Sequence, residues 1–104
     1  MTIPKTLKIG GNIYSVEITD KMDLGSANVS AEINYVDLKI RIAPNAPGKM
    51  QADFLHEMIH GILAFLGYKD HDEKQVEEMA QALYMVIQDN PDIFDADGVY
   101  VVSG

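Results

Sequence analysis

The chain has 104 residues, of which 47% are hydrophobic and 23% charged, a composition typical of one globular domain with a single core. Its formal net charge of −8 argues against a protein that binds nucleic-acid phosphates or anionic membranes, because those partners require clustered Lys and Arg. The absence of cysteine excludes disulfides and thiolate metal sites.

The N-terminal sequence "MTIPKTLKIGG" lacks the apolar segment of a signal peptide. No apolar run approaches the roughly 18 residues of a membrane span. These features predict a cytoplasmic protein without a membrane or nucleic-acid partner.

The first part of the chain, about residues 6–43, is predicted to form β-strands. Alternating apolar and polar residues flank the turn sequence Gly-Gly-Asn at 10–12, which indicates a β-hairpin. A second hairpin is expected from residues 29–43, with its turn near 35–37. Its second half, "LKIRIA" at 38–43, alternates cleanly and therefore predicts a half-buried strand.

Two long helices are predicted after the Pro- and Gly-rich segment 43–48. The first, about residues 48–66, carries an apolar stripe at spacings of three and four, formed by Phe54, Leu55, Met58, Ile59, Ile62 and Leu66. The second, about residues 72–89, has Asp70 or Asp72 as its expected N-cap and ends before Pro91.

The tail, residues 90–104, is expected to be loose or to hold one short strand at 99–102. The prediction for residues 1–104 is thus a single α+β domain, in which a small antiparallel or mixed sheet packs on two long helices.

The sequence "HEMIH" at 56–60 lies within the first predicted helix. Residues four apart share one side of a helix, so His56 and His60 can reach a common point. Two imidazoles and a third ligand leave one open position, as in a catalytic zinc site. Glu57 would then act as the general base toward a metal-activated water that attacks a carbonyl. Alternatively, His56 and His60 are metal-free core side chains.

A third ligand must come from elsewhere in the chain. Leu66 occupies the position at which a metzincin would carry a histidine, which excludes that class. The remaining candidates are His71, Glu73, Glu77 and Glu78. Glu78 points away from the apolar stripe of the second helix, and Glu73 is explained by its place in the first turn. Glu77, at the border of the stripe, is the preferred third ligand.

"HEMIH" followed by "EKQVEEMAQAL" resembles the gluzincin group of zincin metallopeptidases, especially small ImmA/IrrE-like phage or prophage proteins and minigluzincins. The resemblance covers about residues 38–90 and implies a minimal zincin-like fold. It implies zinc (Zn²⁺) held by His56, His60 and Glu77, with Glu57 as general base. A DNA-binding or sensor domain is not present in the sequence.

The same resemblance implies two further features. An edge strand of the sheet would bind extended peptide by main-chain hydrogen bonds, and "LKIRIA" would be its counterpart here. A tyrosine or histidine would help to hold the oxyanion, for which Tyr35, Tyr68, His71 and Tyr84 are candidates.

Three interpretations of function follow. The preferred one is a zinc metalloendopeptidase acting on a peptide or protein substrate. The second is a catalytically weak or inactive zinc-stabilised binding module, such as a phage accessory protein. The third is a metal-free domain with His56 and His60 in its core. The substrate sequence and the oligomeric state are not readable from the chain.

Overall fold

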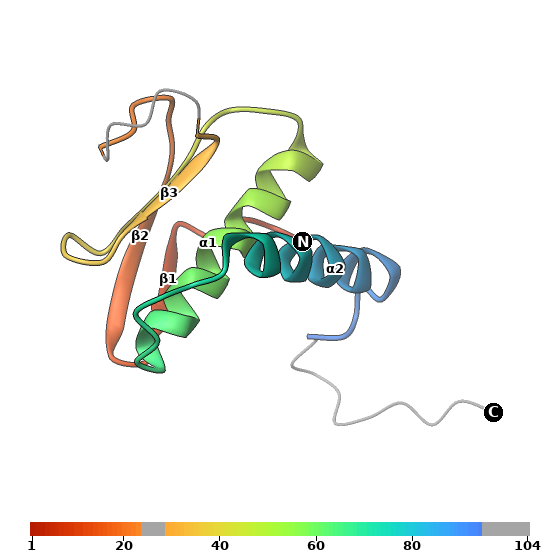
Figure 1. Ribbon diagram of the computed structural model, residues 1–104. Helices are drawn as coiled ribbons and strands as arrows, with labels where there is room; N and C mark the ends of the chain where they lie inside the picture. The colour runs from red at the N-terminus through yellow and green to blue at the C-terminus, as the bar shows by residue number, and fades with distance from the viewer. Residues whose placement is uncertain (24–28, 95–104) are drawn as a thin grey trace.

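A computed structural model describes residues 1–23 and 29–94 and confirms the predicted α+β class (Figure 1). The elements are β1 (Thr6–Ile9), β2 (Asn12–Ile18), β3 (Ala31–Asn34), β4 (Lys39–Ile42), α1 (Pro47–Phe65) and α2 (Glu73–Asp89). Both helices lie within one residue of their predicted bounds. The strand expected at 99–102 falls outside the described residues.

Both predicted hairpins are present. β1 pairs antiparallel with β2 through the Gly-Gly-Asn turn, where Gly10 has a φ of 60° that favours glycine. β3 pairs antiparallel with β4, and the Asn34 side chain accepts hydrogen bonds from the backbone N–H groups of Val36 and Asp37 in the intervening turn. Short-range turn chemistry therefore defines both hairpins.

The two hairpins join through a parallel pair, β2 with β4, which gives the mixed strand order β1-β2-β4-β3. This order corrects the expectation that "LKIRIA" supplies the edge strand, because β4 is internal and β3 lies at the edge. It also corrects the expected half-burial of β4. The guanidinium of Arg41 is buried among the carboxylates of Glu17, Asp23 and Glu32, which replace its hydration.

The core is formed by the sheet, α1 and the face of α2 that packs on α1 (Figure 1). Among the described helices and strands, α2 lies next to α1 only. Its most buried members are Tyr14, Ile33, Ile40, Ile42, Phe54, Leu55, Ile59, Val76, Ala80 and Ile87. The predicted stripe of α1 is only partly buried, since Leu66 is exposed and Ile62 is partly exposed. α1 therefore packs against the sheet on one side and against α2 on another.

The connection from α1 to α2 is short and well fastened at both ends. Gly67, with a φ of 93°, follows α1, and the backbone N–H of Tyr68 donates to the carbonyl of Leu63. Asp72 caps α2 by accepting a hydrogen bond from the backbone N–H of Gln75, as the sequence predicts for one of two aspartates. The first turn of α2 is thereby fixed beside the C-terminal half of α1.

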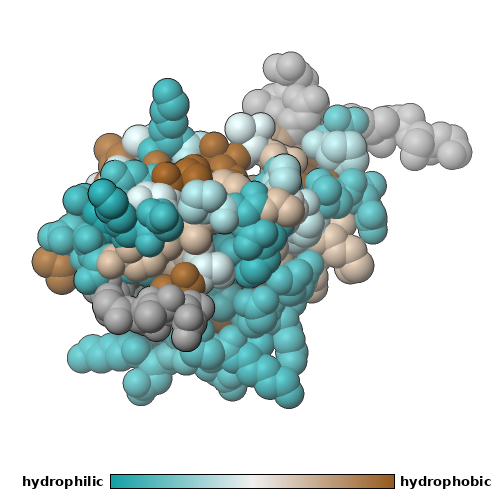
Figure 2. All heavy atoms as spheres, turned by 90° about the horizontal axis from the view of Figure 1, so that it is seen from above, coloured by the Kyte–Doolittle hydropathy of each residue, from teal (hydrophilic) through white to brown (hydrophobic). Residues whose placement is uncertain are grey.

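The surface is mainly polar. Figure 2 shows hydrophilic residues over most of one face, with hydrophobic side chains in small separate groups. Within residues 1–23 and 29–94, neither helix has the length and hydropathy needed to span a bilayer.

Candidate metal and catalytic site

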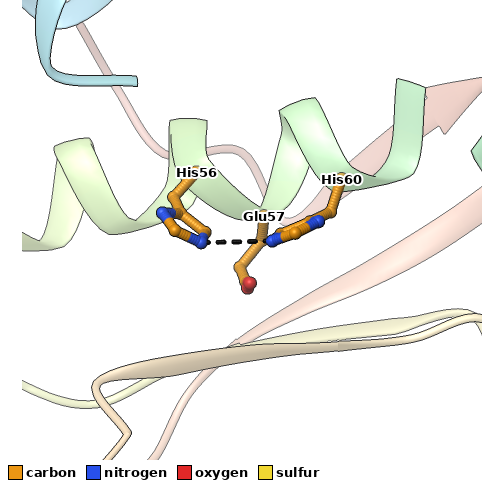
Figure 3. Close-up of side chains that lie close together, drawn as sticks. All are labelled: His56, Glu57 and His60. Atoms are coloured by element: carbon orange, nitrogen blue, oxygen red, sulfur yellow. Dashed lines mark hydrogen bonds between the residues drawn. The ribbon is translucent and has the colours of Figure 1, made fainter. Parts of the chain in front are cut away.

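The site begins with two histidines one turn apart on α1. Their Nε2 atoms lie 3.2 Å apart, and the close-up shows the two rings turned toward each other with Glu57 beside them (Figure 3). His60 is buried and His56 is partly exposed. Together with Glu57, they form a group of donor atoms within 4.8 Å of one another that could hold a metal ion. The expected convergence of His56 and His60 is therefore present in the geometry.

Glu73, from the first turn of α2, reaches the same point. Its carboxylate oxygens lie 3.2 and 3.3 Å from Nε2 of His60, and one of them lies 3.4 Å from Nε2 of His56. Ligand atoms bound tetrahedrally at zinc–ligand distances of about 2.0–2.1 Å are about 3.3–3.4 Å apart. The three side chains thus already have the separations of a tetrahedral metal site.

Glu77 occupies a different place from the one expected. Its carboxylate contacts Nδ1 of His56 at 2.6 Å, on the far side of the ring from the shared point. This geometry favours Glu73 over Glu77 as the third ligand, because the tight connection brings position 73 over the histidine pair. Since Asp72 serves as the N-cap, Glu73 is free to face α1.

A chain of ring contacts sets the orientation of His60. Nε2 of His71 lies 2.9 Å from the carbonyl oxygen of Tyr68, and Nδ1 of His71 lies 2.7 Å from Nδ1 of His60. A carbonyl only accepts, so Nε2 of His71 donates to it, and in the tautomer with its single ring proton on Nε2 the His71 ring accepts at Nδ1. His60 then donates from Nδ1, and its Nε2 lone pair faces the shared point.

The same reasoning applies to His56. The Glu77 carboxylate accepts from Nδ1 of His56, because hydrogen bonds from Gln81 and His56 lower the pKa of Glu77 and keep it ionised. In the tautomer with its proton on Nδ1, the Nε2 lone pair of His56 is also directed at the shared point. A metal ion, or a proton carried by one of the rings, can then lie between the two Nε2 atoms, which are 3.2 Å apart.

Glu57 is the most perturbed carboxyl group of the site. It is only 5% exposed, and its Oε2 has no hydrogen-bond partner among the described residues. Burial raises its pKa to about 7; the neighbouring carboxylates of Glu73, Asp53 and Glu32 act in the same direction, while His56 opposes them. A carboxyl group with a pKa near neutrality can both take up and release a proton in a catalytic cycle.

This pKa predicts that, without metal, the free energy of unfolding of the wild type and of the Glu57→Gln variant depends differently on pH. The folded state holds the Glu57 proton more tightly than the unfolded state, so its stabilising contribution is complete below about pH 4.5 and is lost as the pH rises through about 7. Glu57→Gln has no such proton to lose. The change in the free energy of unfolding caused by Glu57→Gln should therefore be more favourable at pH 8 than at pH 4.5, by up to about 3 kcal/mol.

Urea unfolding in a chelating buffer at both pH values measures this difference. Burial lowers the pKa of His60, which has the opposite effect on pH dependence, but His60 is present in both proteins and cancels in the comparison. A stability difference that is the same at both pH values would contradict the prediction.

Cavities flank the site on both sides. One of about 240 Å³ is lined by His56, Glu57, Glu77, Lys49, Asp53 and residues 29–31 at the start of the edge strand β3. Another of about 390 Å³ is lined by Tyr35, Ala64, Gly67, Tyr68, Lys69 and His71. An equally large cavity formed by residues 1–5 and the start of α1 contains none of the site residues.

The four oxyanion candidates are placed differently. The hydroxyl of Tyr84 donates to the Gln51 side chain, and His71 is engaged with His60. Tyr68 is exposed. Burial raises the pKa of Tyr35 to about 12, with further increases from Glu57, Tyr14 and Glu73. Tyr35 is also exposed, and it lines the cavity of about 390 Å³ together with Tyr68 and His71. Of the four, Tyr35 is the one whose pKa is raised by the carboxylates of the site.

Comparison with known proteins adds no assignment: no family model matches the chain, and no match was found among curated proteins or solved structures. The interpretation of the site therefore depends on its own residues and their geometry.

Proposed function

We propose that this protein is a zinc-dependent metallopeptidase in which His56, His60 and Glu73 bind the metal and Glu57 is the general base. The observation that carries the proposal is the convergence of three donor atoms, 3.2–3.4 Å apart, from two helices. Two imidazoles and one carboxylate with an open fourth position are the donor set of a catalytic zinc site. The resemblance to gluzincins supports the same reaction.

The residues of the chain divide the chemical work among them. When bound, zinc supplies Lewis acidity toward water and a substrate carbonyl. The Glu57 carboxylate receives a proton from the attacking water and returns it to the leaving amine, a transfer for which a pKa near 7 is suited. Glu77 and His71 hold the rings of His56 and His60 with their Nε2 atoms facing inward.

An extended peptide is the substrate class that the surroundings support. β3 is an edge strand, and residues 30 and 31 at its start line the same cavity as His56 and Glu57. A peptide that adds to this edge by main-chain hydrogen bonds would pass over the catalytic carboxylate.

The openness of the site supports a second candidate, a zinc-stabilised binding module. The Glu73 side chain is 72% exposed, so α2 shields the proposed metal position only slightly from solvent. In this alternative, zinc joins the two helices and the edge strand binds a partner without cleaving it.

The deciding experiment measures metal content and hydrolysis together. The peptidase proposal expects one zinc per chain by elemental analysis, cleavage of an unfolded protein such as casein, loss of cleavage on chelation, and recovery when zinc is restored. Stoichiometric zinc without any cleavage would leave only the binding module. Absence of zinc after incubation with the ion would contradict both.

His71 is expected to act on zinc affinity through His60. His71→Ala removes the acceptor that fixes the Nδ1 proton of His60, and loss of such an orienting partner typically costs about 10–100-fold in metal affinity. Competition with a chromophoric chelator measures the change. Lys69→Ala, in the same connection, provides a control in which affinity should remain unchanged.

Tyr35 is expected to donate a hydrogen bond to the oxyanion of the reaction. Tyr35→Phe retains the ring and removes only the hydroxyl, so hydrolysis should fall by about 10²–10³-fold while zinc affinity is preserved. Equal activity of Tyr35→Phe and the wild type would remove Tyr35 from this role.

A further inference from the structure

Lys49 is a charged side chain beside the proposed site to which the reaction assigns no role. It lies in the first turn of α1, and its Nζ atom lies 2.6 Å from Oδ1 of Asp53 and 3.2 Å from the hydroxyl oxygen of Ser30. An ammonium group has three N–H donors, so these two acceptors leave one donor for another partner. The Lys49 side chain is 46% exposed and lines a cavity, so a ligand can reach it.

Asp53 holds the ammonium of Lys49 in place. The Asp53 side chain is only 8% exposed, and it lies one turn after Lys49 on α1. A long lysine side chain normally loses conformational entropy when it binds a ligand. Its hydrogen bonds to Asp53 and Ser30 restrict that freedom before any ligand arrives. The ammonium is therefore preorganised between α1 and the residue that precedes β3.

The edge strand β3 presents main-chain groups for strand addition beside this ammonium. Hydrogen bonding within the antiparallel β3–β4 pair runs through alternate residues, and the N–H of Ala43 donates to the carbonyl of Ser30. The N–H and C=O groups of Ala31 and Ile33 therefore point to the open side of the sheet. A peptide paired with Ala31 passes the cavity of about 240 Å³ that Glu57 and the lysine also line.

The charges around this cavity favour a neutral acceptor over a carboxylate. The positive charge of Lys49 is balanced by Asp53. Hydrogen bonds from Gln81 and His56 lower the pKa of Glu77, so its carboxylate adds a negative charge to the cavity. A substrate carboxylate would meet that like charge. A main-chain carbonyl has no net charge and can accept a charge-assisted hydrogen bond from the ammonium.

We propose that Lys49 is a substrate-binding residue whose ammonium donates a hydrogen bond to a main-chain carbonyl of a peptide paired with the edge of β3. The proposal rests on the proposed function and names the part of the substrate that this site recognises. Asp53, which holds the ammonium, lies one turn before Glu57, about 6 Å along the helix axis or about two extended residues. The carbonyl therefore belongs to a residue close to the scissile bond, and its recognition does not depend on the side chains of the substrate.

The test measures peptide binding, so that its result does not depend on turnover. Glu57→Gln protein supplied with zinc is immobilised, and frontal chromatography measures its mean affinity for mixtures of hexapeptides blocked at both ends. One mixture contains only uncharged residues, and a second also contains Asp and Glu. Lys49→Met keeps most of the side-chain length but removes the ammonium, so it should weaken binding of the uncharged mixture by about 10-fold or more.

Two comparisons control for side effects of the substitution. Lys49→Met leaves the buried carboxylate of Asp53 without its cation, so the Lys49→Met/Asp53→Asn double variant is also compared with Asp53→Asn, and the same loss is expected. Lys74→Met removes an ammonium that is 87% exposed on α2, and should leave the affinity unchanged.

Unchanged affinity in both Lys49 comparisons, a loss confined to the acidic mixture, or no retention of either mixture would overturn the proposal. Failure of zinc binding or of casein cleavage would contradict the peptidase function alone, because the effect of Lys49 on peptide retention is measured without turnover.

Discussion

Glu57→Gln is expected to lower the rate of peptide hydrolysis by about 10²–10⁴-fold while the protein still binds one zinc ion. The substitution keeps the size and shape of the side chain but removes the group that takes up the proton. Glu57 is buried beside the histidine pair and its pKa is about 7, so the variant loses a carboxyl group that is placed and poised for this proton transfer.

The measurement compares the cleavage rate of casein by wild type and variant at equal zinc content. Glu78→Gln is the matched control, since it makes the same chemical change at an exposed position of α2 and should retain full activity. Retention of wild-type activity by Glu57→Gln would contradict its role as base.

Glu73→Ala is expected to reduce zinc affinity by more than the roughly 10–100-fold that follows loss of an outer hydrogen-bond partner. The carboxylate of Glu73 is within 3.4 Å of both Nε2 atoms, so in the proposed site its removal would leave His56 and His60 as the two remaining ligands. Glu77→Ala removes only the acceptor at Nδ1 of His56 and should have the smaller effect.

Chelator competition on the two variants measures this order of effects directly. Both residues lie on one side of α2, separated by a single turn, and both substitutions remove one negative charge, so general electrostatics affects them similarly. The reverse order, with Glu77→Ala the weaker zinc binder, would restore the ligand set expected from the sequence.

The sequence predicts local features of this fold well because they depend on neighbouring residues. The turn at 10–12, the N-cap at Asp72 and the apolar periodicity of α1 and α2 are each encoded within a few positions. The convergence of His56 and His60 is predictable for the same reason, since their spacing on one helix suffices.

Features that join distant segments were predicted less well. The parallel pairing of β2 with β4 places β3 at the edge, and no local signal in "LKIRIA" reveals this order. The burial of Arg41 depends on carboxylates from three other segments, so its alternation with apolar residues resembled that of a half-exposed strand.

The choice between Glu73 and Glu77 depended on how the two helices cross. Both residues lie on the same side of α2, so helical periodicity did not separate them. The capping of α2 by Asp72 was the available signal, because it makes a capping role for Glu73 unnecessary. His71 was considered only as a third ligand or an oxyanion donor, since its contact with Nδ1 of His60 requires knowledge of tertiary structure.

The position of α2 beside α1, and not beside the sheet, also bears on how this molecule opens. We expect α2 to detach in a local unfolding event that leaves the strands and α1 paired, so its amide protons should exchange before those of the sheet. A ligand that bridges His56, His60 and Glu73 joins α2 to the rest of the protein and suppresses that event in proportion to its binding free energy. The same three side chains would then control both the chemistry and the cooperativity of the fold.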